Sequence, residues 1–181
     1  MNLFSAIAKL YRPAPAIPRL PANQIDEAYR KQRIRSFIAI FIGYAAYYMV
    51  RNNFTLAMPY LSKEFGYSKA TLGLVAFALP AAYGISKFVM GNVSDRSNSR
   101  FFIATGLILT AITTLIFGCV PAIAMSVDAM FIVIALSGWA QGMGAGPCYR
   151  TVAHWFPQKK RGLIMAMWNP SHNIGAALLA L

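Results

Sequence analysis

Long apolar runs alternate along the chain with short polar segments that are mostly basic. The apolar runs cover residues 36–61, 70–93, 101–121, 129–152 and 162–181. A helix needs about 20 mostly apolar residues to cross a bilayer, and helices satisfy their own backbone groups inside lipid. We therefore predict an all-α membrane protein with five transmembrane helices, the fifth cut off by the end of the chain. Residues 1–35 are predicted to be a basic cytoplasmic tail.

The composition agrees with a membrane protein and excludes an ordinary soluble domain. Hydrophobic residues make up 57% of the chain and charged residues only 12%, whereas soluble domains have about 25% charged residues. The net charge of +12 would suit a nucleic-acid partner, but the charge lies between apolar runs and no nucleic-acid motif is present.

In the tail, four prolines disfavour helix, and residues 26–35 are expected to form a short helix at the membrane surface.

The distribution of basic residues predicts the topology. Of the seventeen Lys and Arg residues, twelve lie in the tail and in segments 91–100 and 153–162, whereas only Lys63 and Lys69 lie on the opposite side. Cytoplasmic loops carry the excess of Lys and Arg in membrane proteins. The amino terminus is therefore predicted to be cytoplasmic.

An arginine in the first apolar run is the first candidate for chemistry. Arg51 at the centre of a bilayer costs roughly 2.5–3.5 kcal/mol, so such residues usually face a polar interior and have a function. Tyr44 lies seven residues before Arg51, Tyr48 lies three residues before it, and Thr55 lies four residues after it. At these spacings all four side chains share one face of a helix. This face is typical of one wall of an anion site.

Two further basic side chains repeat this pattern in other runs. Lys87 follows Tyr83 by four residues, although a lysine near the end of a span can also extend to the membrane surface. His172 shares a helical face with Asn169, Asn173 and Ala176, although a single histidine often only bonds across a helix interface. Together with Arg51, both are predicted to bind an anion.

The acidic residues define what kind of ligand these cations need. All five lie in the tail, in loops or at the ends of spans: Asp26, Glu27, Glu64, Asp95 and Asp128. Buried cations without acidic partners favour a ligand that brings its own negative charge, and the fork of an arginine fits two oxygens of a phosphate. The absence of an acid within a span disfavours a cation-driven symporter.

Other polar residues point to structural roles. No nucleophile and base pair is apparent, so the chain is not expected to be an enzyme. Cys119 and Cys148 fit no metal-ligand spacing, and neither a metal nor a cofactor is expected. Arg150, at the cytoplasmic end of its span, is expected to contact an interface or a loop. Gly138, Gly142 and Gly146 line one helix face and predict close helix packing.

Several segments together resemble a known transporter family. The loop GNVSDRSNSR contains Gly91, Asp95, Arg96 and Arg100 at the spacing of the loop signature of the major facilitator superfamily. The segments GYAAYYMVRNNF, AYGISKF, GWAQGMG, HWF and WNPSHNIG resemble its organophosphate:phosphate antiporters. The resemblance implies twelve helices in two halves, of which this chain would hold about five, from the N-terminal half.

The resemblance also implies roles for residues. Arg51, Lys87 and His172 match the family's phosphate-binding positions, and the further site-lining positions correspond to Tyr44, Tyr48, Tyr83 and Asn169. The other half of the transporter would supply a second arginine, so this chain by itself is not expected to transport.

The function implied by the resemblance is exchange of an organophosphate for inorganic phosphate by alternating access, in the bacterial inner membrane and without a cofactor. A sugar-phosphate sensor of a two-component system is the alternative, since such relatives share the site. The organic substrate stays open. Asn52 replaces a basic residue common in glycerol-3-phosphate and hexose-phosphate transporters, and VRNNFTL is similar to phosphoglycerate transporters. The tail is similar to glycerol-3-phosphate transporters.

Overall fold

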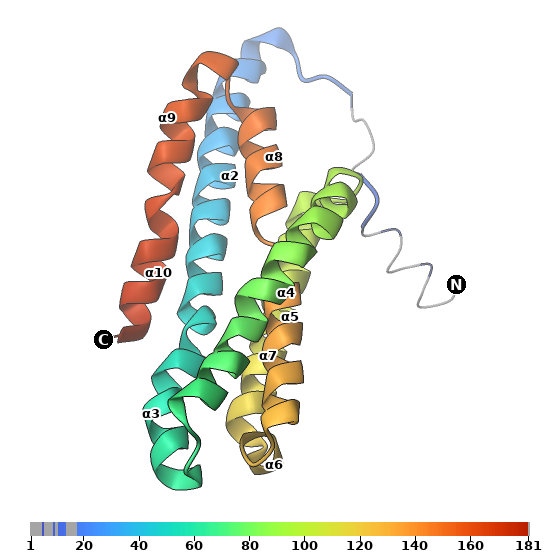
Figure 1. The fold of residues 1–181 in the computed structure, drawn as a ribbon. Helices are drawn as coiled ribbons and strands as arrows, with labels where there is room; N and C mark the ends of the chain where they lie inside the picture. The colour runs from blue at the N-terminus through green and yellow to red at the C-terminus, as the bar shows by residue number, and fades with distance from the viewer. Residues whose placement is uncertain (1–4, 6–8, 10, 14–17, 181) are drawn as a thin grey trace.

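The structure is a computed structural model that describes residues 5, 9, 11–13 and 18–180, and the regular structure of these residues is helical (Figure 1). In chain order the helices are α2 (Ala22–Arg51), α3 (Asn53–Phe65), α4 (Lys69–Asp95), α5 (Ser99–Cys119), α6 (Pro121–Ala124), α7 (Val127–Gln141), α8 (Ala145–Trp155), α9 (Gln158–Trp168) and α10 (Pro170–Ala180). The predicted all-α class is confirmed. Residues 1–4, 6–8, 10 and 14–17 of the predicted tail, and Leu181 of the predicted fifth span, lie outside the described residues.

Within the described residues, three stretches of helix are long and apolar enough to cross a membrane. They are α4, α5 and the stretch Val127–Trp155, which contains α7 and α8. These stretches correspond to the second, third and fourth predicted spans. The first predicted span is divided between α2 and α3 at Asn52, and the fifth between α9 and α10 at Asn169. All five membrane spans stay predictions, and spans one and five are each made of two consecutive helices.

Helix α2 begins well before the first predicted span. Residues 26–35 are helical as expected, but they continue directly into the apolar part of α2 instead of forming a separate surface helix. Pro21 stands immediately before the first residue of α2, and between Ala22 and Ser36 there is no proline or glycine to end a helix. The helix therefore runs without interruption from the predicted tail into the predicted span.

The extension of α2 packs on the corner between α8 and α9. The Tyr29 hydroxyl donates a hydrogen bond of 2.6 Å to the carbonyl oxygen of Trp155. The Arg33 guanidinium lies over the rings of Tyr29 and Phe156, at 5.5 Å from each centroid. These contacts hold the start of α2 beside the basic segment 153–162.

Local signals explain where several helices begin and end. Three helices start with a side chain that accepts a backbone N–H of the first turn: Ser68 for α4, Asn98 for α5 and Ser126 for α7. Helix α3 ends at Gly66, whose φ of 69° is in the left-handed region that glycine adopts without strain. The short turn between α3 and α4 follows from this cap and from the cap of α4.

The ends of the helices separate into two groups. The start of α2, the end of α4 and the connection from α8 to α9 lie toward the upper end of the molecule in Figure 1, whereas the end of α3 and α6 lie at the lower end. The upper group carries the basic segments 91–100 and 153–162. This arrangement agrees with the predicted separation of basic loops.

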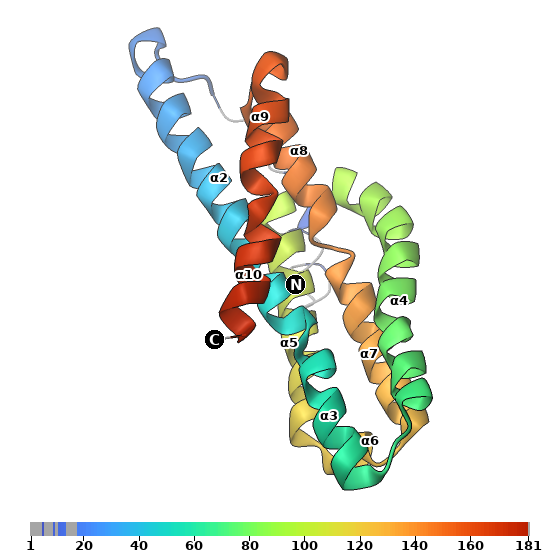
Figure 2. The same ribbon diagram turned by 60° about the vertical axis from the view of Figure 1, so that its left-hand side comes forward.

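Small residues bring the helices close together. A Cβ atom on Gly138 would overlap the backbone of Leu79, and one on Gly142 would overlap the Ser86 side chain. The Ser86 hydroxyl also donates a 2.7 Å hydrogen bond to the carbonyl oxygen of Trp139. Helices α4 and α7 consequently lie side by side, as Figure 2 shows, and the predicted packing role of Gly138 and Gly142 is confirmed. A Cβ on Gly146 would lie 3.4 Å from the Ser94 side chain, an ordinary contact distance.

Two hydrophobic clusters occupy different levels of the bundle. One contains Ile40, Tyr44 and Tyr47 together with residues of α8 and α9. The other contains Phe54 and Leu61 of α3 together with residues of α4 and α7. In the sequence, Arg51 lies between the residues of α2 that belong to the first cluster and the residues of α3 that belong to the second. Its charge is therefore placed between two apolar layers.

Candidate functional site

Arg51 is the last residue of α2 and stands directly before the break in the first predicted span. Asn52 follows with φ −93° and ψ 3°, and α3 begins at Asn53. Two consecutive asparagines weaken a helix, because their side chains compete for backbone hydrogen bonds. Arg51 is half-buried. The break therefore places a basic side chain at a level where the regular backbone is interrupted.

Two tyrosine rings contact the guanidinium of Arg51, and one of these rings also contacts a lysine. The guanidinium lies over the rings of Tyr48 and Tyr83, at 5.1 Å and 4.4 Å from their centroids, and its Nη1 donates a 3.3 Å hydrogen bond to the Tyr48 hydroxyl. The Lys87 Nζ lies 4.6 Å from the centroid of the same Tyr83 ring. Lys87 thus contacts Tyr83, which precedes it by one turn of α4. Its side chain is directed away from the end of α4 at Asp95, whereas a lysine that extended to the membrane surface would be directed toward that end.

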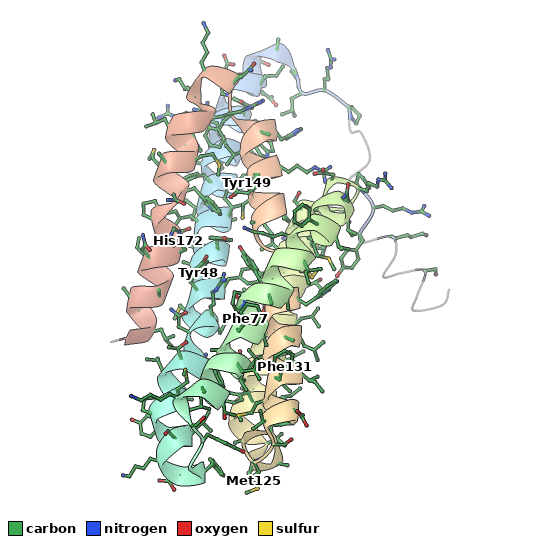
Figure 3. The ribbon with its side chains drawn as sticks, viewed as in Figure 1. Tyr48, Phe77, Met125, Phe131, Tyr149 and His172 are labelled. Atoms are coloured by element: carbon green, nitrogen blue, oxygen red, sulfur yellow. The ribbon has the colours of Figure 1, made fainter. Side chains whose placement is uncertain are left out.

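His172 joins the cluster through Tyr48. Their ring centroids are 5.2 Å apart, and Figure 3 shows both side chains at a similar height on α10 and α2. The contact depends on close packing, because a Cβ on Gly175 would overlap the backbone of Ala45. The three predicted cations are therefore linked through two tyrosines: Arg51 and His172 contact Tyr48, and Arg51 and Lys87 contact Tyr83.

The remaining predicted residues differ in their environment. Tyr44 is buried, and its ring packs on those of Tyr48 and Trp168 at centroid distances of 5.4 Å and 4.4 Å. Its hydroxyl lies next to that of Tyr83 on α4. Asn169 occupies the break between α9 and α10, where its side chain is exposed. Tyr44 is thus part of the aromatic wall, whereas Asn169 is at its edge.

Arg51 also borders a cavity next to the break between α2 and α3. An open cavity of about 200 Å³ lies between the break and α4, lined by Arg51, Asn52, Thr55, Pro80 and four apolar residues. Lys87 and His172 are outside the lining of this cavity. Of the predicted cations, only Arg51 therefore faces this cavity in the described part of the chain.

The predicted loop signature lies away from the cation cluster. Asp95 ends α4, Arg96 follows it, and Arg100 is in the first turn of α5; all three side chains are exposed, whereas Gly91 is half-buried in α4. The loop is held from α8, where Arg150 Nη1 donates hydrogen bonds of 2.7 Å and 2.6 Å to the carbonyl oxygens of Ser94 and Ser97. The predicted loop contact of Arg150 is confirmed.

Replacing Arg150 by methionine should destabilise the protein. We expect Arg150→Met to lower the free energy of unfolding by about 2 kcal/mol, because hydrogen bonds from a charged group contribute about 1.5–3 kcal/mol. Thermal unfolding of the detergent-solubilised protein measures the change. Lys160→Met, at an exposed position of α9, is the control and should have little effect. Equal melting temperatures for the two variants would contradict a stabilising role of Arg150.

Two residues near the site carry signals that sequence reasoning did not resolve. Trp168 is buried, its Nε1 donates a 3.3 Å hydrogen bond to the carbonyl oxygen of Ile40, and it packs edge-on against Tyr149. Gln141 is buried in α7, and its side-chain carbonyl oxygen has no hydrogen-bond partner. The sequence signal for Gln141 is a polar amide within a long, uncharged and mostly apolar run.

The fold and the cluster together define a class of protein: a helical membrane protein in which basic side chains gather around two tyrosines beside an interrupted helix. Comparison with known proteins makes this more specific. A model of the Major Facilitator Superfamily matches residues 40–181. The chain belongs to the Major Facilitator Superfamily.

Curated relatives carry several different names, of which three illustrate the range. The chain is 52% identical over 171 residues to the glycerol-3-phosphate transporter of Bacillus subtilis (strain 168), covering 94% of this chain and 38% of the relative. It is 39% identical over 162 residues to the phosphoglycerate transporter protein of Salmonella typhimurium, covering 90% and 34%. It is 37% identical over 172 residues to the membrane sensor protein UhpC of Escherichia coli (strain K12), covering 95% and 38%. The chain thus spans well under half the length of these relatives.

Proposed function

We propose that this chain supplies the N-terminal part of a transporter that exchanges an organophosphate for inorganic phosphate by alternating access. Arg51, Lys87 and His172 bind the phosphate group, while Tyr44, Tyr48, Tyr83 and Asn169 line the site. The remaining portion of the transporter, by which the relatives exceed this chain, contributes the other half of the site.

The clustering of Arg51 and Lys87 around one tyrosine ring carries this proposal. Both side chains contact Tyr83, while the five acidic residues of the sequence are all exposed and stand near helix ends or in the α2 extension. Like charges held together without an acidic partner are unfavourable in a medium of low dielectric constant. A phosphate dianion neutralises them and provides oxygens for the arginine fork.

The same charges explain why exchange is favoured over one-way leak. An empty site leaves the cations unpaired, which raises the free energy of any closed state that excludes water. Inorganic phosphate and an organic phosphate both remove this penalty, so the loaded transporter changes orientation more readily than the empty one. Rocking of two halves around a central site is the general scheme for this fold.

The organic substrate is proposed to be a small phosphate monoester, with glycerol-3-phosphate the first choice. The glycerol-3-phosphate transporter of B. subtilis is more similar to this chain than the phosphoglycerate transporter of S. typhimurium, which favours the first. The transporter is proposed to lie in the bacterial inner membrane with its amino terminus in the cytoplasm, as the basic segments indicate.

Counterflow in proteoliposomes tests the proposal. The complete transporter, meaning this chain together with the portion by which its relatives are longer, is reconstituted into vesicles loaded with inorganic phosphate. Uptake of labelled glycerol-3-phosphate that depends on internal phosphate is expected, and 3-phosphoglycerate and glucose-6-phosphate serve as competitors. Uptake that is independent of internal phosphate would rule out antiport.

A membrane sensor is the second candidate, and the similarity to UhpC supports it. A sensor has the same need for a phosphate site, so the residues alone do not separate the two. A sensor binds its ligand without accumulating it. Saturable binding to the complete protein with no counterflow would therefore favour the sensor.

A further inference from the structure

One aromatic ring contacts both Arg51 and Lys87. The Arg51 Cζ is 4.4 Å and the Lys87 Nζ 4.6 Å from the centroid of Tyr83. The two cations come from different helices, α2 and α4, whereas Tyr83 and Lys87 are one turn apart on α4. Within the described part of the chain, Tyr83 is the one ring that lies under both an arginine and a lysine.

We propose that Tyr83 is a positioning residue, whose ring holds Arg51 and Lys87 together in the empty site and keeps them in place when a phosphate group binds. This inference rests on the proposed function, because it assumes that these cations bind phosphate. It assigns Tyr83 a role that acts through the cations and does not require a contact with the ligand.

The first step of the argument is electrostatic. Two positive side chains on neighbouring helices repel each other, and the exposed Lys87 is free to turn away from Arg51 unless something attracts both. The face of an aromatic ring carries partial negative charge and attracts a cation by roughly 0.5–2 kcal/mol, depending on desolvation. A half-buried tyrosine between the two cations therefore offsets part of their repulsion without adding a formal negative charge.

The second step is geometric. A guanidinium that stacks on a ring uses its face, and its N–H groups point outward in the plane of the group. One of these groups on Arg51 already reaches the Tyr48 hydroxyl at 3.3 Å, which leaves others for phosphate oxygens. The ring contact is therefore compatible with a bound anion, and Tyr83 lowers the entropic cost of arranging the cations.

The hydroxyl of Tyr83 offers a different explanation that the test has to separate. It lies next to the Tyr44 hydroxyl and the Lys87 ammonium, so it can orient Lys87 or reach the ligand by itself. Phenylalanine keeps the ring and removes the hydroxyl, whereas leucine removes the aromatic face. The two substitutions therefore distinguish the ring from the hydroxyl.

Equilibrium binding of labelled inorganic phosphate to the purified complete transporter measures the effect. We expect Tyr83→Phe to change the dissociation constant less than about 2-fold and Tyr83→Leu to weaken binding about 10-fold, as the loss of partly desolvated cation–π contacts implies. Tyr60→Leu is the matched control, because Tyr60 is 73% exposed on α3. It should bind phosphate as the unchanged transporter does.

Fluorinated phenylalanines at position 83 sharpen the test, because they keep the shape of the ring while each fluorine weakens its negative face. Phosphate affinity should fall progressively with the number of fluorine atoms, which a purely structural role of the ring would not produce. Equal affinity along this series, or equal losses in Tyr83→Phe and Tyr83→Leu, would overturn the proposal. If the unchanged transporter failed to bind phosphate at all, the proposed function itself would be wrong.

Discussion

Arg51→Lys is expected to lower phosphate-linked exchange by about 10- to 100-fold in the complete transporter. Lysine keeps the positive charge but loses the planar fork that donates two parallel hydrogen bonds to one phosphate. A hydrogen bond to a charged group contributes about 1.5–3 kcal/mol, and 1.4 kcal/mol corresponds to a factor of ten. The initial rate of glycerol-3-phosphate counterflow in proteoliposomes measures the loss.

The matched control for this change is Arg35→Lys. Arg35 lies on the same helix, but its side chain is exposed in the basic extension of α2. This variant should exchange substrate at close to the original rate. Normal exchange by Arg51→Lys, with the control also normal, would exclude a phosphate-binding role for the guanidinium of Arg51.

Gly175→Ala is expected to lower the free energy of unfolding by about 2–3 kcal/mol, the upper part of the range for overpacking a tight contact. The new Cβ would overlap the backbone of Ala45, which has no flexible side-chain atom that can move aside. Helices α10 and α2 would have to separate, and His172 would lose its position beside Tyr48. Thermal unfolding of the purified protein measures the stability change.

Gly162→Ala is the same chemical change, but we expect it to raise the free energy of unfolding. A Cβ at Gly162 meets nothing within 4 Å, and this residue is exposed in the interior of α9. Alanine should therefore stabilise the helix by about 0.5–1 kcal/mol relative to glycine. A melting temperature for Gly175→Ala equal to that of Gly162→Ala would show that close approach of α10 and α2 is unimportant.

The packing of α10 on α2 has a consequence for the site. Ser171 is buried and lies one turn before Gly175 on the face of α10, and its hydroxyl oxygen has no hydrogen-bond partner. Small residues four apart allow two helices in a membrane to approach closely. The contact between His172 and Tyr48 thus depends on small, uncharged neighbouring residues of α10.

Helix periodicity was sufficient to predict part of the site. The spacing of Tyr44, Tyr48 and Arg51 placed them on one face, and the structure joins Tyr44 to Tyr48 and Tyr48 to Arg51. The spacing of Tyr83 and Lys87 was equally informative. Within one helix, sequence separation determines which side chains are neighbours, so these contacts needed no knowledge of the fold.

Contacts between helices were beyond such reasoning. Nothing in the spacing indicated that Arg51 would lie closer to the ring of Tyr83, on α4, than to that of Tyr48 on its own helix. The pairing of Trp168 with Tyr44 across α9 and α2 was likewise not predicted. Periodicity assigns a residue to a face, but the partner of that face depends on how whole helices pack.

The sequence by itself determined the helical membrane class, the separation of the basic loops and the presence of cations without acidic partners. These properties depend on the transfer free energy of each segment between water and lipid, which is a local sum over residues. Only the tertiary structure decided that Arg51, Lys87 and His172 gather around Tyr48 and Tyr83. That arrangement results from close packing of small residues between helices that are far apart in the chain. Transfer free energies summed over single segments contain no information about such contacts.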